Sequence, residues 1–99
     1  MQIEEVLGNR LRVKILKILN QVKELNVSEI ARRINANHKT TMKHLKILEN
    51  EGILYHKRFG RIRLYRFNIN SAKARAIQSL MENWDKSEEP AKSFRTTVK

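Results

Sequence analysis

The sequence predicts a single, mainly helical domain that carries one small β-hairpin. Apolar residues recur three and four positions apart in several separate segments, which is the spacing of helices packed on a core. Between residues 53 and 69 apolar and polar side chains alternate instead, as they do in β-strands. The chain has 99 residues, a length that buries one hydrophobic core and not two.

The first long helix is predicted to begin at Asn9 and to end near Asn20. Leu11, Ile15 and Ile18 recur within it at helical spacing. Residues 2–7 carry their own short apolar stripe, which is either an additional turn of this helix or a separate short helix.

Residues 22–27 show no helical period, and a short second helix is predicted to follow them. Ser28 is its expected N-cap, because a serine hydroxyl can accept hydrogen bonds from the free amides of a first turn. The helix contains Ile30, Ala31 and Ile34 and is expected to end near Asn35.

The third helix is the clearest element of the sequence and is predicted from His38 to Glu51. Asn37 is its expected N-cap, and Gly52 offers the left-handed residue that commonly follows a helix. The side chains expected to face the core are Thr41, Leu45 and Leu48.

The alternating segments Ile53–Phe59 and Ile62–Ile69 predict a hairpin that turns at Gly60-Arg61. Tyr55, Tyr65 and Phe67 could stack on the bases of a single strand, but period-2 aromatic residues in a ribbon more often pack on helices beneath it. We therefore expect the side chains of Tyr65 and Phe67 in the core.

A last helix is predicted after Asn70 or Ser71, either of which can cap it. Its broad apolar stripe consists of Ala76, Ile77, Leu80, Met81 and Trp84. From Lys86 onward the composition becomes polar. We expect one domain at residues 1–86, in which residues 70–86 serve dimerisation, and a mobile polar tail at residues 87–99.

The charge of the chain favours a polyanionic partner. Lys and Arg number 21 against 10 Asp and Glu, a formal net charge of +11. No apolar run approaches the length of about 20 residues that a membrane-spanning helix needs. The first residues, which include Glu4 and Glu5, do not resemble a signal peptide, so we expect a cytoplasmic, nucleoid-associated protein.

Catalytic and metal-binding patterns are not expected. The sequence has no cysteine, only 3 glycines without a Gly-rich cluster, and scattered acidic residues, so neither an enzyme nor a cofactor is predicted. His38, His44 and His56 lack the paired spacing of metal ligands. We expect His38 to face DNA and His44 to pack at the edge of the core.

A short helix, a tight turn and a longer helix match the helix-turn-helix geometry, in which the second helix enters the DNA major groove. The face opposite the core side chains presents His38, Lys39, Met42, Lys43 and Lys46. Such a face can also be merely solvated. From Arg32 to Arg75, however, 12 basic residues accompany only Glu49 and Glu51, which favours DNA.

The segment from Ile34 to Asn68, INANHKTTMKHLKILENEGILYHKRFGRIRLYRFN, resembles the helix-turn-helix and wing of winged-helix regulators of the arsenic-repressor (arsR) type. The stretch LGNRLRVKIL at residues 7–16 resembles their first core helix. HLKILENEGIL and GRIRLYRFN are the most specific parts. The resemblance implies dimeric binding to double-stranded DNA, with the third helix in the major groove and the hairpin as a wing.

Carried onto this chain, the base-facing segment of the family falls on His38, Lys39, Thr40, Lys43 and Lys46, and its wing-tip contacts fall on Arg58, Gly60, Arg61 and Arg63. Metal-sensing members use cysteines, or carboxylate and histidine pairs on the last helix. This chain has no cysteine, and its last helix has no histidine, so we expect no metal.

The last helix is expected to pair two subunits, because a core of three helices and a hairpin has little room for its whole apolar stripe. The residues predicted at this dimer interface are Ile3, Val6, Leu7, Ile77, Leu80, Met81 and Trp84. In the alternative, this helix folds over its own wing and the protein is a monomer. The sequence thus predicts a dimeric, sequence-specific transcriptional regulator. The alternative function is a winged-helix module for RNA or protein partners, or a less specific chromatin-type DNA binder.

Overall fold

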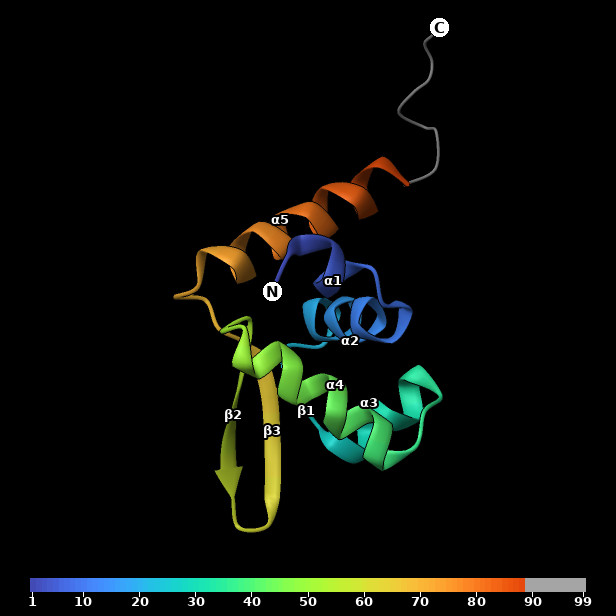
Figure 1. Cartoon of the computed structure of the whole chain (residues 1–99), viewed down its shortest axis with the longest axis vertical. Helices are drawn as coiled ribbons and strands as arrows, with labels where there is room; N and C mark the ends of the chain where they lie inside the picture. Colours follow the sequence, from blue (N-terminus) through green and yellow to red (C-terminus); the bar gives the residue numbers. More distant parts are fainter. Residues whose placement is uncertain (89–99) are drawn as a thin grey trace, which may run out of the picture.

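The computed structural model describes residues 1–88, which form five helices and a small three-stranded sheet (Figure 1). In chain order the elements are α1 (Ile3–Leu7), α2 (Arg10–Gln21), β1 (Leu25–Asn26), α3 (Val27–Ile34), α4 (His38–Asn50), β2 (Leu54–Phe59), β3 (Ile62–Phe67) and α5 (Ala72–Ser87). The predicted class, a winged helix-turn-helix with an added C-terminal helix, is confirmed. The hairpin projects from one end of the molecule, and α5 crosses the other end (Figure 1).

The helix boundaries follow local capping side chains. The Asn9 side chain accepts from the amides of Leu11 and Arg12, and Ser71 accepts from the amide of Ala74. Asn37 accepts from the Thr40 amide at 2.7 Å, as predicted. Each of these contacts satisfies an amide that has no partner within its own helix. Residues 3–7 form a separate helix, which settles the alternative left open by the sequence.

The N-cap of α3 is Asn26, and the prediction of Ser28 was wrong. The Asn26 side chain accepts from the Glu29 amide at 2.8 Å, and the helix begins at Val27. Val27 is buried, so the helix begins where its first apolar side chain reaches the core. Ser28 lies exposed within the first turn.

The turn between α3 and α4 is tight because Asn35 adopts a left-handed conformation with φ of 57°. Asparagine tolerates this region better than most residues. The Asn35 and Ala36 amides donate to carbonyls in the last turn of α3. The chain therefore reverses within a few residues and enters α4 at His38.

The hairpin forms in the predicted register, from Leu54 opposite Phe67 to Phe59 opposite Ile62. Gly60 at its tip has φ of 63°, a conformation that favours glycine. The sequence did not predict the third strand, β1, which pairs with β3 through Leu25 opposite Tyr65 and gives the sheet order β1-β3-β2. Two residues are too short to show a period, so this strand exists only through its partner.

The core lies between the helices and the sheet. Leu45 and Leu48 of α4 are fully buried, and so is Thr41, whose hydroxyl donates to the Asn37 carbonyl at 2.8 Å. Tyr65 and Phe67 are 1% and 4% exposed, which confirms that these aromatic side chains belong to the core. Gly52 follows α4 with φ of 76°, as predicted for a helix end.

The apolar stripe of α5 is divided between two environments. Ile77 and Met81 face the core of the protomer, together with Ala74. Leu80 and Trp84 are 49% and 63% exposed. The helix ends at Ser87, one residue beyond the predicted boundary. Of the predicted polar tail at residues 87–99, only residues 87 and 88 are described. The prediction for residues 89–99 lies outside the described residues.

Replacing Asn26 should destabilise the protein more than replacing Ser28. Asn26→Ala removes the cap of α3 and should lower the free energy of unfolding by about 1 kcal/mol. Ser28→Ala, the matched control in the same turn, should change it by less than about 0.5 kcal/mol. Urea denaturation followed by circular dichroism measures both values. If both substitutions lowered the free energy of unfolding equally, the assignment of Asn26 as the N-cap in place of Ser28 would be contradicted.

Candidate nucleic-acid interface

The N-terminal half of α4 presents a basic surface. His38, Lys39 and Lys43 are exposed, and Lys46 follows one turn later, also exposed. Thr40 is half-buried, and its amide is occupied by the Asn37 side chain. Since Thr41, Leu45 and Leu48 hold the opposite side in the core, these lysines point into solvent.

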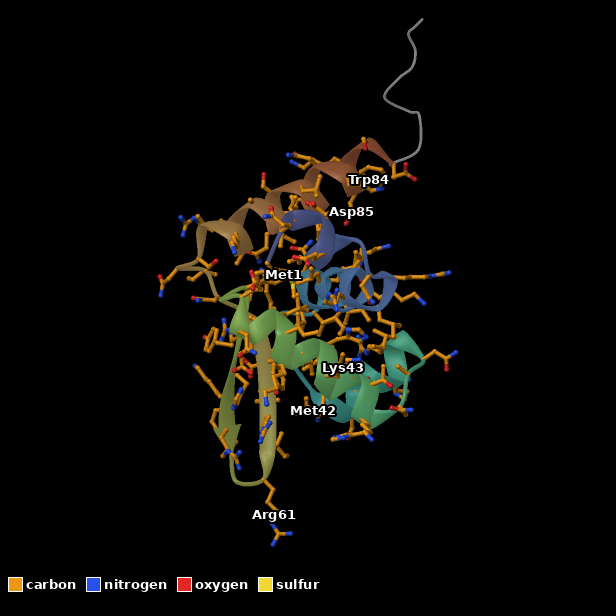
Figure 2. All side chains as sticks on the ribbon, viewed as in Figure 1. Met1, Met42, Lys43, Arg61, Trp84 and Asp85 are labelled. Carbon is orange, nitrogen blue, oxygen red and sulfur yellow. The ribbon has the colours of Figure 1, made fainter. Side chains whose placement is uncertain are left out.

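The hairpin, called the wing below, carries its own cations. Arg58 and Arg63 lie opposite each other on neighbouring strands, on the same side of the ribbon as the buried Tyr65. Arg61 extends from the tip, away from the rest of the molecule (Figure 2). The wing therefore carries positive charge both along one side and at its end.

A hollow of about 330 Å³ lies between the start of α3, the start of α4 and the wing. His38 borders it from α4, and Arg61 and Arg63 border it from the wing. The remaining lining residues are Asn26, Val27, Ser28, Met42 and Ile62. This hollow is called the basic groove below.

The basic groove unites only some of the predicted DNA-binding residues. His38, Arg61 and Arg63 meet there, whereas Lys39, Lys43 and Lys46 lie on the adjoining exposed face of α4, and Arg58 lies on the other strand of the wing. The sequence did not predict that Asn26, Ser28 and Ile62 would line a binding surface. The one sequence feature that could have indicated this role is an apolar residue, Ile62, among the basic residues of the wing tip. In the structure Ile62 is 51% exposed.

The acidic residues of α3 and of the segment before β1 are paired with arginines outside this set of cations. Glu24 binds Arg66 at 3.2 Å, and Glu29 binds Arg32 at 2.7 Å. The hydrogen bond from Arg32 holds the pKa of Glu29 below its ordinary value. Within residues 1–88 no acid lies at ion-pair distance from Lys39, Lys43, Lys46, Arg58, Arg61 or Arg63. These cations remain available to an anionic partner.

The three histidines lie in three different environments. His56 of β2 contacts Glu49 of α4, with 2.6 Å between Nδ1 and Oε2, and so joins the wing to α4. His44 is 7% exposed, which confirms its packing at the core, and His38 lines the basic groove. In the part of the chain that the structure describes, no three histidine, aspartate or glutamate side chains gather in a possible metal site.

The opposite end of the molecule is apolar. One groove of about 340 Å³ lies between α2 and α5 and is lined by Val13, Lys17, Leu80, Met81, Trp84 and Asp85. A smaller hollow nearer the N-terminal end of α5 is bordered by α1, including Ile3, Val6 and Leu7. Trp84 and Asp85 lie near the C-terminal end of α5, far from the tip of the wing (Figure 2).

The residues predicted at a dimer interface differ in the solvent exposure of their side chains. Ile3 is 69% exposed, and Leu80 and Trp84 are also open to solvent. Leu7 is half-buried. Val6, Ile77 and Met81 are nearly covered within the protomer and have little surface left for a second copy. Among the described helices, none is both long and apolar enough to traverse a lipid bilayer.

Comparisons with known proteins agree with this geometry. Residues 9–56 match the arsR family of bacterial regulatory proteins. No curated protein matches the chain in sequence. Among solved structures, the transcriptional repressor PagR of Bacillus anthracis shares 26% identity and a TM-score of 0.65, covering 78% of this chain and 85% of PagR.

Two further structures share the fold. Reduced HlyU from Vibrio cholerae has a TM-score of 0.72 at 20% identity, covering 87% of this chain and 84% of HlyU. A homodimeric winged helix-turn-helix DNA-binding domain from Mycobacterium bovis, described as a possible ArsR-family regulator, has a TM-score of 0.69 at 23% identity. The match covers 93% of this chain and 82% of that domain.

Proposed function

Because this chain is a DNA-binding transcriptional regulator with the helix-turn-helix of the bacterial arsR family, we propose that two copies bind one two-fold site on duplex DNA. In each copy α4 enters the major groove and the wing contacts the backbone or the adjacent minor groove. Occupancy of promoter DNA then hinders or recruits RNA polymerase, and the protein itself performs no chemical reaction.

The basic groove is the observation that carries this proposal. His38 of α4 and Arg61 and Arg63 of the wing border the same hollow, although His38 precedes Arg61 by 23 positions in sequence. A surface on which a helix and a hairpin both present cations fits a duplex, because one element can enter a groove while the other follows phosphates.

The two parts of this surface have different roles in the proposal. The exposed residues of α4 reach base edges: His38 and Lys43 donate hydrogen bonds there, and Lys39 and Lys46 flank them. Arg58, Arg61 and Arg63 neutralise phosphates or enter the minor groove. Thr40 lies at the N-terminal end of the same helix, where its hydroxyl can contact the backbone.

Dimerisation is proposed through α5 with help from α1. Leu80 and Trp84 form an exposed apolar surface on α5, and Ile3 adds to it from α1. A two-fold axis lets this single surface cover itself and places two recognition helices about one turn of DNA, roughly 34 Å, apart. Residues 1–86 are thus proposed to act as one domain with a dimerisation helix at its end.

Binding should depend steeply on salt and should prefer DNA to RNA. If a dimer neutralises about 6 to 10 phosphates, the slope of log affinity against log salt is about −5 to −9. Fluorescence anisotropy with a duplex selected from random DNA measures this slope, and an RNA duplex of the same sequence is the competitor. A flat salt response, or equal binding of the RNA, would refute the DNA proposal.

Substitutions in α4 and in the wing should change binding in different ways. Lys43→Ala should reduce the preference for the selected site over unrelated duplexes, because it removes a contact to base edges. Arg61→Ala should weaken all duplexes by a similar factor and reduce the salt slope by about 1. Arg10→Ala, which removes an exposed cation of α2, is the control. If Lys43→Ala changes neither affinity nor preference, the reading face is wrongly assigned.

Charge in the exposed apolar surface of α5 should separate the subunits. Leu80→Glu and Trp84→Glu are expected to sediment as monomers at micromolar concentration and to lose cooperative binding to a palindromic site. Ser79→Glu adds the same charge at an exposed position of α5 outside the stripe and should leave the dimer intact. A monomeric wild-type protein would refute the proposed dimer, and a dimeric Leu80→Glu variant would place its interface on another element.

A further inference from the structure

One guanidinium group joins three helices of this protein. Arg12 of α2 donates from Nη2 to the Glu5 carbonyl at 2.6 Å and from Nε to the Val6 carbonyl at 3.4 Å. Its Nη1 donates to Nδ1 of His44 at 3.1 Å. Glu5 and Val6 lie in the last turns of α1, and His44 lies on α4. Arg12 therefore contacts both α1, which is proposed to assist dimerisation, and α4, which is proposed to read DNA.

The position of α1 depends on this contact. A helix of five residues is too short to be stable through its own hydrogen bonds. Its last carbonyls have no partner within the helix, and an arginine supplies both donors and a favourable charge at that end. Arg12 thus holds the C-terminal end of α1 on α2.

The other end of the contact is a buried imidazole. His44 is 7% exposed, so water cannot easily replace Arg12 as its partner. A guanidinium only donates hydrogen bonds, so Nδ1 must accept, which requires the neutral ring with its proton on Nε2. Burial, and then the charges of Arg12 and Lys43, hold the pKa of His44 below its ordinary value.

We propose that Arg12 is a positioning residue for the recognition helix, because it ties α4 through His44 to the last turn of α1. This inference rests on the proposed function, in which α1 lies at the dimer surface and Lys43, the neighbour of His44, reads bases. Pairing that holds α1 in place then holds α4 in its DNA-reading position. By thermodynamic linkage, DNA binding strengthens the pairing by the same factor.

The charged groups around His44 give the pH dependence a definite sign. Arg12 from α2 and Lys43 from α4 both oppose protonation, and no acid within residues 1–88 acts against them. The Glu5 carboxylate of α1 accepts instead from the Gln2 amide at 2.7 Å. Protonation of His44 removes the acceptor of Arg12 and adds a like charge beside it. The contact is therefore complete at and above the ordinary histidine pKa of about 6.5, and it is lost as the pH falls through the lower pKa of His44 in the folded protein.

Removing the guanidinium should weaken DNA binding without removing a phosphate contact. Arg12→Met should lower the affinity for the selected duplex about tenfold, the effect of losing the charge-assisted hydrogen bond that reaches α4, and leave the salt slope unchanged. Arg10→Met removes the same charge from an exposed position of the same helix and should bind within about twofold of the wild type. A salt slope reduced by about 1 in Arg12→Met would show a direct phosphate contact and overturn the proposal.

Variants at His44 test the link itself. His44→Leu lacks the acceptor and should match Arg12→Met, and the double variant should bind no more weakly than either single variant. His44→Gln keeps a neutral acceptor and should retain wild-type affinity at neutral pH. The ratio of wild-type affinity to His44→Gln affinity should decrease as the pH is lowered from about 6.5. Any effects of His38 and His56 cancel in this ratio, because both proteins contain these residues. A ratio independent of pH contradicts the proposal, whether or not Arg12→Met folds.

Hydrogen exchange on the protein without DNA separates this inference from the proposed function. His44→Leu should accelerate amide exchange of Val6 and Leu7 in α1, although position 44 lies on α4. Unchanged exchange in α1 means that Arg12 does not join the two helices. If the wild-type protein fails to bind duplex DNA, the proposed function fails, and the exchange result still decides whether the link exists.

Discussion

The amphipathic packing of α4 is the constraint on which the rest of the structure depends. Thr41, Leu45 and Leu48 are fully buried, so the helix cannot rotate about its axis without moving Lys39 or Lys43 toward the core. Burial of a lysine without a partner would cost several kcal/mol. The hydrophobic core thus decides which side chains α4 presents to a partner.

The wing depends on the same helix and on a strand far away in sequence. Leu25 of β1 pairs with Tyr65 of β3, and the Tyr65 ring packs in the core beneath. The contacts Glu24–Arg66 and Glu49–His56 link the wing to the body. Half-exposed ion pairs contribute at most about 1 kcal/mol each. Strand pairing and the burial of Tyr65 therefore supply most of the stability of the wing, and the ion pairs help to orient it.

The molecule presents opposite chemistry at its two ends. Uncompensated cations lie on the wing and the start of α4, and exposed apolar side chains lie on α5 and α1. This separation fits our proposal, in which one end binds DNA and the other pairs with a second copy. In our proposal Arg12 connects the two ends, because its guanidinium contacts α1 and α4 from the helix that lies between them.

The sequence by itself determined the elements whose signals are local. Helical spacing identified α2, α4 and α5, Asn37 and Ser71 capped their helices as expected, and alternation with Gly60 identified the hairpin. The resemblance to the arsR family, the winged-helix class and the basic character of α4 and the wing also followed from residue patterns. These features are encoded within a few positions of one another, so one segment suffices to specify each.

Only the tertiary structure decided the features that join distant segments. β1 exists because Leu25 meets Tyr65, and the start of α3 at Val27 follows from the burial of that residue. The division of the α5 stripe, with Met81 inward and Trp84 outward, depends on how the helix lies on the core. The basic groove and the Arg12–His44 contact likewise require side chains from separate elements. No local period or capping rule specifies such pairs, because their partners are set by packing across the whole domain.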